Sequence, residues 1–215
     1  MELRTSPDVV SAAADELVSA LESRLAVAER CSLAISGGSS PGPVFERLAD
    51  ARLDWERVDV FQVDERIAPD GDSARNLTGQ RAALLDRVPC RSFPMPVTAD
   101  DLVAAAGRYA DLLPDELDVV HLGLGDDGHT ASLVPGDPAV HVVDTTVTIT
   151  GDYRGHRRMT LTYPALHRAK RIVWFAPGEA KRPMLERLRS ADPTIPGGRV
   201  AADRAVLVTD VCWQE

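Results

Sequence analysis

Short apolar segments alternate with longer amphipathic segments along most of the chain. The apolar segments predict buried strands, because a strand that is covered on both faces carries few polar residues. The amphipathic segments repeat apolar residues at helical spacing, as Val10, Leu17, Leu21 and Leu25 do. Strands are expected at residues 32–36, 58–63, 117–124, 172–176 and 205–209, and helices at 10–25, 41–52, 76–85, 100–112 and 179–190.

This β-α-β rhythm predicts an α/β fold, in which a doubly wound, mostly parallel, Rossmann-like sheet carries helices on both faces. Residues 140–148 are rich in β-branched side chains and are also expected to be extended. No repeat, low-complexity tract or linker interrupts the pattern, so residues 1–215 are expected to form a single domain. Ligands of such sheets bind beyond the carboxyl ends of the strands, which is where a site is expected.

Composition and charge narrow the possible partners. The net charge of −9 disfavours binding to nucleic acid or to an anionic membrane, although a local group of amides and cations can still bind an anion. No segment approaches the ~18 apolar residues of a membrane span, and residues 1–7 do not resemble a signal peptide. Cys31, Cys90 and Cys212 are widely spaced and predict idle thiols rather than a disulfide framework. The sequence does not indicate an oligomeric state.

The first loop with unusual chemistry is Ser-Gly-Gly-Ser-Ser-Pro-Gly at residues 36–42, between a predicted strand and a predicted helix. Gly37 and Gly38 allow backbone amides to approach a ligand closely. Ser39 and Ser40 add hydroxyl groups, and the start of the helix adds free N–H groups and a partial positive charge. The loop therefore predicts a phosphate-binding cradle, with a simple tight turn as the alternative.

The same loop also fits the G-x-S-x-G nucleophile elbow of serine hydrolases, with Ser40 in the nucleophile position. In that motif the residue after the nucleophile donates its backbone N–H to the oxyanion hole. Here that residue is Pro41, which has no N–H. A serine hydrolase is therefore disfavoured.

The second loop begins with Asp64-Glu65-Arg66, directly after the apolar strand at 58–63, and Asn76 follows it. Charges at the end of a buried strand lie at the sheet edge where ligands bind. We expect Arg66 to hold a phosphate or sugar group and Asp64 to hold Arg66 in place. The alternative is a solvated ion pair on the surface.

The third loop, residues 123–132, follows the central strand and is rich in glycine. It brings Asp127 and His129 close enough to share one site. An imidazole with an ordinary pKa near ~6.5 is suited to general-base chemistry, and a carboxylate can orient it. His121 lies inside the strand and is expected to pack in the core. The sequence has no HExxH motif, no Cys/His cluster and no dinucleotide fingerprint, so neither a metal nor a nicotinamide cofactor is expected.

Taken in this order, the three loops resemble those of the 6-phosphogluconolactonase family. The matching segments are SGGSSP at 36–41, VDERIAP at 63–69 with Asn76, GLGDDGHTASLVPG at 123–136, RMTLTYPAL at 158–166 and GEAK at 178–181. The resemblance runs from about residue 33 to the last strand. Ser40 stands where threonine is common, and Val134 stands where phenylalanine is common. Neither replaces a reactive group.

The resemblance implies a Rossmann-like enzyme that hydrolyses 6-phospho-glucono-1,5-lactone to 6-phosphogluconate in the cytoplasm, as part of the oxidative pentose phosphate route. It implies no metal or organic cofactor, and His129 as the general base. It leaves open how Arg66, Arg158 and Lys181 divide phosphate binding and oxyanion stabilisation. The expected catalytic residues are His129, Asp127 and Arg66, and the expected substrate-binding residues are Gly37, Gly38, Ser39, Ser40, Asp64, Asn76, Arg158 and Lys181.

Two alternatives share this fold. The deaminases that isomerise glucosamine 6-phosphate have Asp-Glu-Tyr in place of Asp-Glu-Arg, and an acid after Gly-His. This chain has Arg66, and its residues 130–134 include no acid. Ring opening and isomerisation need that additional acid–base group. A non-catalytic sugar-phosphate sensor would usually be fused to a DNA-binding segment, for which this chain has no room, and this chain keeps His129.

Overall fold

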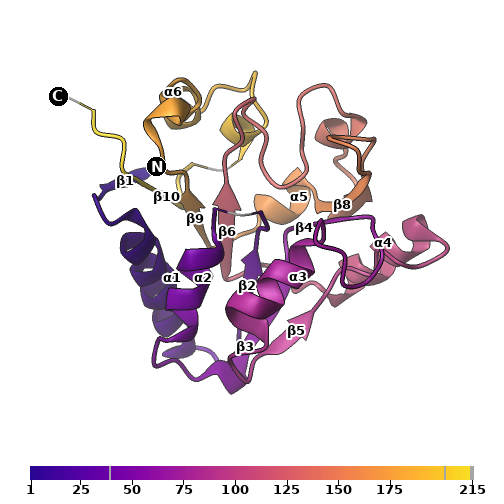
Figure 1. Ribbon diagram of the computed structural model, residues 1–215, viewed down its shortest axis with the longest axis horizontal. Helices are drawn as coiled ribbons and strands as arrows, with labels where there is room; N and C mark the ends of the chain where they lie inside the picture. Colours follow the sequence, from indigo (N-terminus) through magenta and orange to yellow (C-terminus); the bar gives the residue numbers. More distant parts are fainter. Residues whose placement is uncertain (39, 201, 214–215) are drawn as a thin grey trace.

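A seven-stranded sheet forms the centre of the molecule (Figure 1). The computed structural model describes residues 1–38, 40–200 and 202–213. The strands lie in the order β1-β10-β9-β6-β2-β3-β5, and every neighbouring pair is parallel. Their bounds are β1 Glu2–Thr5, β2 Cys31–Ile35, β3 Val58–Gln62, β5 Arg91–Phe93, β6 Val119–Gly123, β9 Arg171–Phe175 and β10 Ala205–Thr209.

Helices cover both faces of this sheet, as predicted. Successive strand residues alternate between two apolar clusters, so that Val119 packs with α1 and α2 while Val120 packs with α4, α5 and α6. Figure 1 shows α1 and α2 together on one side and α4 on the other. The α-helices are α1 Val9–Leu25, α2 Gly42–Ala49, α3 Asn76–Gln80, α4 Leu102–Leu112, α5 Tyr163–Leu166 and α6 Arg182–Arg189.

Capping aspartates mark the start of two of the helices. The carboxylates of Asp8 and Asp101 accept hydrogen bonds from the backbone N–H groups of Ser11 and Ala104, at 3.0 Å each, which caps α1 and α4. The segment after α3 continues as a wider, π-helical turn, so the predicted helix at 76–85 is confirmed. Shorter helical turns are Arg81–Leu85 (π) and Trp55–Arg57, Pro138–His141, Glu179–Lys181 and Gly197–Arg199 (3₁₀).

The direction of the chain across the sheet reverses between β2 and β6, which are neighbours. From β2 the chain proceeds to β3 and β5 on one side, and from β6 to β9 and β10 on the other. At such a switch point the loops that follow the two strands diverge and leave a crevice. The loops here are the glycine–serine loop after β2 and the loop of His129 after β6. The topology thus places two of the three predicted loops side by side.

A second, antiparallel sheet of three short strands was not predicted. Its order is β4-β8-β7, with bounds β4 Asp64–Arg66, β8 Arg158–Leu161 and β7 Val147–Ile149. Val63 joins it to the large sheet, because its N–H donates to Ile35 O (3.0 Å) and its carbonyl accepts from Leu161 N (2.8 Å). The predicted residues Asp64, Arg66 and Arg158 therefore lie on this second sheet.

The prediction that residues 140–148 are extended is wrong at its start, and only its last two residues belong to a strand. Pro138–His141 is a 3₁₀ turn, and strand β7 begins only at Val147. The carboxylate of Asp137 accepts from Ala139 N (2.8 Å) and Pro138 takes the first position of the turn, a start signal that outweighs the β-branched residues after it. Within the described part of the chain, no helix is long and apolar enough to cross a membrane.

Candidate active site

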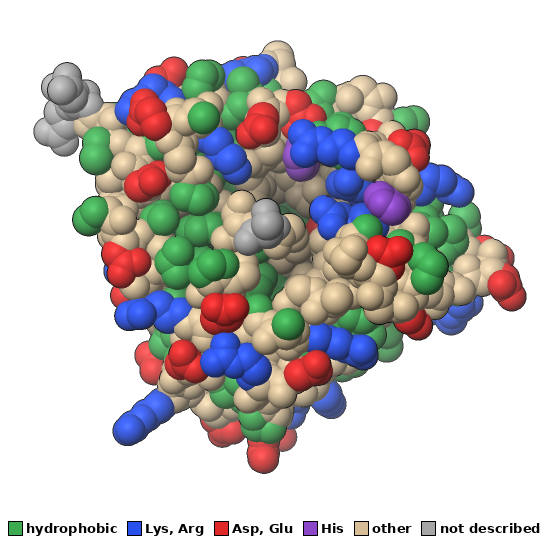
Figure 2. Space-filling model, viewed as in Figure 1, with side chains coloured by type: hydrophobic (Ala, Val, Ile, Leu, Met, Phe, Trp, Pro, Cys, Tyr) green, Lys and Arg blue, Asp and Glu red, His purple; other side chains and the backbone are tan. Residues whose placement is uncertain are grey.

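A cleft of about 480 Å³ opens at the switch point. Lys, Arg and His side chains gather along one rim of the hollow in Figure 2, although the molecule as a whole is acidic. The cations that line the cleft are Arg66, Arg154, Arg158 and Lys181. Ser39 lies outside the described residues. The predicted residues that line the cleft are Gly37, Gly38, Ser40, Asp64, Arg66, Asn76, His129, Arg158 and Lys181.

His129 is paired with Asp127, as the sequence predicted. The Asp127 carboxylate lies 2.5 Å from the imidazole Nδ1 and accepts a second hydrogen bond from the His129 backbone N–H at 3.1 Å. An ionised carboxylate can only accept, so Nδ1 carries the proton and Nε2 keeps its lone pair. The His129 side chain is 19% exposed. Gly125 lets the ring lie close to the backbone, because a Cβ there would come within 2.0 Å of Nδ1.

Tyr153 completes this arrangement and was not predicted. Its hydroxyl donates to the other carboxylate oxygen of Asp127 at 3.0 Å, and its ring packs edge-on against the His129 ring with centroids 5.4 Å apart. Partial burial alone would raise the pKa of Asp127, but the hydrogen bonds from His129 and Tyr153 outweigh it and lower that pKa. Asp127 is therefore an ionised, doubly anchored acceptor behind the imidazole.

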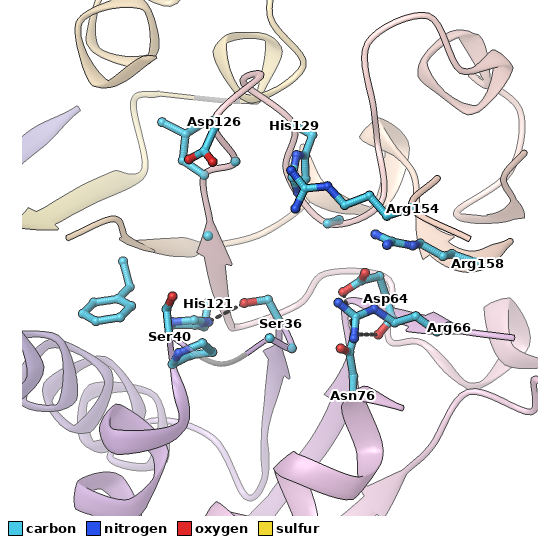
Figure 3. Close-up of a pocket in the computed structure, with 18 of the residues that line it drawn as sticks. Ser36, Ser40, Asp64, Arg66, Asn76, His121, Asp126, His129, Arg154 and Arg158 are labelled. Atoms are coloured by element: carbon cyan, nitrogen blue, oxygen red, sulfur yellow. Dashed lines mark hydrogen bonds between the residues drawn. The ribbon is translucent and has the colours of Figure 1, made fainter. Parts of the chain in front are cut away.

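The glycine–serine loop forms the opposite side of the cleft (Figure 3). Gly37 packs directly against Asn76, since a Cβ at Gly37 would lie 1.9 Å from the Asn76 Cγ atom. Asn76 in turn donates from Nδ2 to the Asp64 carbonyl at 2.8 Å. Ser40 and Pro41 line the cleft at the start of α2. Gly37 is thus held by close packing, and Gly37, Gly38 and Ser40 line the cleft.

His121 is buried as predicted, but it also contributes to the floor of the cleft. Its Nδ1 shares a 2.9 Å hydrogen bond with Ser36 Oγ across the β2–β6 boundary. Its Nε2 is buried and has no hydrogen-bond partner among the described residues. Complete burial lowers the pKa of His121 to about 3, so the ring is neutral at physiological pH.

The segment Asp64-Glu65-Arg66 divides its side chains between the cleft and the interior. Asp64 and Arg66 line the cleft, whereas Glu65 is fully buried. The Glu65 carboxylate accepts from the backbone N–H groups of Asn76 (2.7 Å) and Leu77 (2.8 Å) and pairs with Arg75 at 3.1 Å. Glu65 therefore anchors the start of α3.

The prediction that Asp64 holds Arg66 is wrong. Asp64 accepts from Ser132 Oγ at 2.6 Å and from Asn76 Nδ2 at 3.2 Å. Arg66 instead donates from Nη1 to the Ala74 carbonyl at 2.7 Å. Asp64 and Arg66 flank Glu65 on strand β4, and residues of different loops hold each of them.

The remaining predicted cations are anchored from opposite sides. Lys181 donates to the Leu124 carbonyl at 2.6 Å, and burial lowers the pKa of its ammonium group. Arg158 is buried on β8, stacks over the Tyr153 ring at 4.9 Å and donates to the Tyr153 carbonyl at 3.2 Å. Burial also lowers the pKa of Arg158. Within the described ranges, no three His, Cys, Asp or Glu side chains come together as metal ligands.

A family model described as glucosamine-6-phosphate isomerases/6-phosphogluconolactonase matches residues 4–213. The chain belongs to this family. The family includes both enzyme classes weighed from the sequence, so membership confirms the resemblance and leaves the choice between the two reactions to more similar relatives and to the site.

Two relatives of this family are 6-phosphogluconolactonases by name. The one from Nostoc sp. is 36% identical over 191 residues, covering 82% of this chain and 79% of the relative. The one from Rhizobium meliloti is 32% identical over 227 residues, covering 99% and 97%.

Solved structures of family members have the same fold. The 6-phosphogluconolactonase of Thermotoga maritima superposes with a TM-score of 0.88 at 24% identity, over 97% of this chain and 98% of that one. A monomeric glucosamine-6-phosphate deaminase gives a TM-score of 0.84 at 16% identity, over 97% of both chains. The fold is therefore shared across the family and does not distinguish its activities.

Proposed function

We propose that this chain is a 6-phosphogluconolactonase, which hydrolyses 6-phospho-glucono-1,5-lactone to 6-phosphogluconate. The observation that carries the proposal is the Asp127–His129 pair, which presents an imidazole to a cation-rich cleft beside a glycine–serine loop. Relatives at more than 30% identity over most of their length carry this name. The cytoplasmic location, and the absence of a metal, an organic cofactor or a nucleic-acid partner, stay predictions.

In the reaction that we propose, Nε2 of His129 takes a proton from a water molecule as the water oxygen attacks the lactone carbonyl. The hydrogen bond from Nδ1 to Asp127 supports this, because the ionised carboxylate orients the ring and stabilises its protonated form. The carbonyl oxygen gains negative charge, for which Arg66 in the cleft is a candidate partner. The ring oxygen leaves with the proton from His129, which restores the base.

The phosphate group is proposed to bind at the other side of the cleft. Gly38 and Ser40 at the start of α2 supply amides and a hydroxyl there, and Lys181 and Arg158 add cations to the same cleft. Burial lowers the pKa values of Lys181 and Arg158, which an anionic ligand would oppose by favouring their charged forms. Such contacts hold the lactone end against the water on His129.

A serine nucleophile is not needed in this scheme. Ser36 is hydrogen-bonded to a histidine, but the pKa of His121, about 3, makes that imidazole a poor acceptor of the serine proton at neutral pH. Ser40 is followed by Pro41, which has no N–H for an oxyanion hole. A lactone is already an activated ester, so direct attack by water is sufficient.

The test compares 6-phospho-glucono-1,5-lactone with glucono-1,5-lactone, after spontaneous hydrolysis is subtracted. Charge-assisted contacts contribute roughly 1.5–3 kcal/mol each, so losing two should lower kcat/KM by at least about a hundredfold. Lys181→Ala should impair the phosphorylated substrate far more than the other, whereas Lys170→Ala, which is outside the cleft lining, should impair neither. Equal kcat/KM values for the two lactones, or ammonia release from glucosamine 6-phosphate in their place, would contradict the proposal.

A further inference from the structure

The tight turn Tyr153–His156 projects an additional cation into the cleft. Its ends are joined by backbone hydrogen bonds from Tyr153 N to His156 O (3.0 Å) and from His156 N to Tyr153 O (3.4 Å). The two central residues both have positive φ, 53° at Arg154 and 83° at Gly155. This is the pattern of a type I′ hairpin turn, in which Asn-Gly is the preferred pair.

Arg154 is therefore in a backbone conformation that long side chains rarely adopt. Strained positions of this kind concentrate at functional sites, where the surrounding structure maintains them. Here the turn is maintained by its own hydrogen bonds and by Asp152, whose carboxylate accepts from Gly155 N at 3.1 Å. Asparagine in place of Arg154 would suit the backbone better, so the arginine side chain needs another explanation.

The position of the side chain supplies that explanation. Arg154 is among the residues that line the cleft, and its guanidinium lies 5.1 Å over the centre of the Tyr153 ring. No carboxylate of the described residues forms an ion pair with Arg154, whereas Arg66 and Arg158 each donate to a carbonyl. The guanidinium donors of Arg154 therefore remain available to a ligand.

The Arg154 guanidinium lies at the end of the cleft where His129 and Asp127 are found. The ring of Tyr153 contacts the Arg154 guanidinium and the His129 ring, and its hydroxyl donates to Asp127. Figure 3 shows the Arg154 side chain extending toward His129, with Ser40 on the opposite side of the pocket. A cation beside the base lies near the carbonyl that the activated water attacks.

We propose that Arg154 is a substrate-contacting residue, which donates to the carbonyl oxygen of the lactone as negative charge develops on it. This inference rests on the proposed function, because it takes the reaction to be attack of water on that carbonyl. A guanidinium is suited to the task, since it stays charged and its hydrogen bonds to an oxyanion are charge-assisted. The strained turn keeps this donor in place before the substrate arrives.

The experiment uses Arg154→Asn, which removes the cation and supplies the residue that the turn prefers. Its melting temperature should equal or exceed that of the wild type, while kcat falls by at least about tenfold on both the phosphorylated and the unphosphorylated lactone. Arg154→Lys should recover part of the loss, and Arg154→Gly repeats the test without any constraint on φ. Arg157→Asn is the matched control, because it removes an exposed arginine of the same hairpin that does not line the cleft, and it should stay within about twofold of the wild type.

Three results would overturn the assignment. The first is a kcat for Arg154→Asn and Arg154→Gly within about twofold of the wild type. The second is a loss limited to KM for the phosphorylated lactone, which would place Arg154 at the phosphate. The third is an equal loss in Arg157→Asn, which would reflect net charge alone. An inactive wild type would instead overturn the proposed function, and the role of Arg154 with it.

Discussion

Two histidines line the same cleft, eight residues apart, and differ in what surrounds them. His121 is completely buried, shares Nδ1 with a serine hydroxyl and has an Nε2 that no described residue contacts by a hydrogen bond. His129 is partly exposed and shares Nδ1 with an ionised carboxylate, which a tyrosine also holds. Burial lowers the pKa of His121 to about 3. Only the second ring has both access to water and a group that stabilises its protonated form.

The difference shows that lining a cleft is not sufficient for acid–base chemistry. A base must meet water and must find its charged form stabilised in place. At His121 the apolar rings of Phe45 and Phe175 pack against the imidazole, with centroids 5.0 Å and 6.2 Å away, and its hydrogen bond goes to a serine rather than to a carboxylate. We therefore expect substitution of His129 to lower turnover, and substitution of His121 to change the stability of the fold.

The largest effect is expected from His129→Ala. Loss of the general base should lower kcat by roughly 10²-fold or more, with the fold intact by circular dichroism. Steady-state hydrolysis of 6-phospho-glucono-1,5-lactone measures it. His141→Ala, which removes an exposed histidine outside the cleft lining, is the control and should behave like the wild type. Near-wild-type turnover in His129→Ala would exclude this residue as the base.

Asp127→Asn should come next, with a loss in kcat of about tenfold or more, because a neutral amide no longer stabilises the protonated imidazole. The hydrogen bonds to Asp127 lower its pKa, so its carboxylate is ionised from about pH 5 to pH 8, and the loss should be largest on the alkaline plateau, where the imidazole of both proteins is deprotonated. A rate profile over pH measures this. Equal plateau values of kcat for Asp127→Asn and the wild type would argue against a charged partner. Asp111→Asn, on the exposed side of α4, is the matched control.

A smaller loss, about two- to tenfold in kcat, is expected from Tyr153→Phe. The variant removes one hydrogen bond to Asp127, and such a bond contributes roughly 0.5–1.5 kcal/mol. The ring that packs against His129 remains. Tyr163→Phe removes a buried hydroxyl that donates to the Pro196 carbonyl at 3.1 Å, and should reduce stability without changing kcat. Equal kcat values for Tyr153→Phe and the wild type would remove Tyr153 from the positioning of Asp127.

His121→Phe should leave kcat within about threefold of the wild type and change the pH dependence of stability. The folded pKa, about 3, lies below that of an unfolded histidine, so the unfolded state binds an additional proton between about pH 6.5 and pH 3. The wild type should therefore lose about 1.4 kcal/mol of unfolding free energy per pH unit as the pH falls through this window. The variant should lack this contribution.

Urea unfolding at several pH values below about 6.5 provides the measurement. Exposed His141→Gln is the control and should keep the slope of the wild type. An unchanged slope in His121→Phe would show that His121 is not held neutral. A loss of kcat comparable to that of His129→Ala would contradict the comparison of the two rings.

Five strands of the large sheet could be predicted because they are continuous apolar segments, which are recognisable without any knowledge of their neighbours. The edge strands β1 and β5 were not predicted, because most of their residues are polar and exposed. The small sheet could not be predicted. Strand β4 is Asp64-Glu65-Arg66, three charged residues whose extended form depends on pairing with β8. Its existence is a consequence of tertiary contacts, which outweigh local propensity in short strands.

Within the site, prediction succeeded where the partners are close in sequence. Asp127 and His129 are two residues apart, whereas Tyr153 reaches Asp127 from 26 residues away and Ser36 reaches His121 from 85. The expected pairing of Asp64 with Arg66 failed, because alternate residues of a strand share a face but each found a nearer partner in another loop. Arg154-Gly155 was not recognised from the sequence, because the direction of the arginine depends on the geometry of the turn.

The position of Val63 between the two sheets limits which mutations this protein can accept during evolution. It hydrogen-bonds to both sheets, and strand β4 begins at the next residue. An insertion or deletion of one residue here would shift the register of β4 by one residue and turn each of its side chains to the opposite face. Glu65 would then enter the cleft, while Asp64 and Arg66 would turn toward the core. A substitution at this junction changes one contact at a time. A change in its length would instead reverse which β4 side chains face the cleft and which face the core.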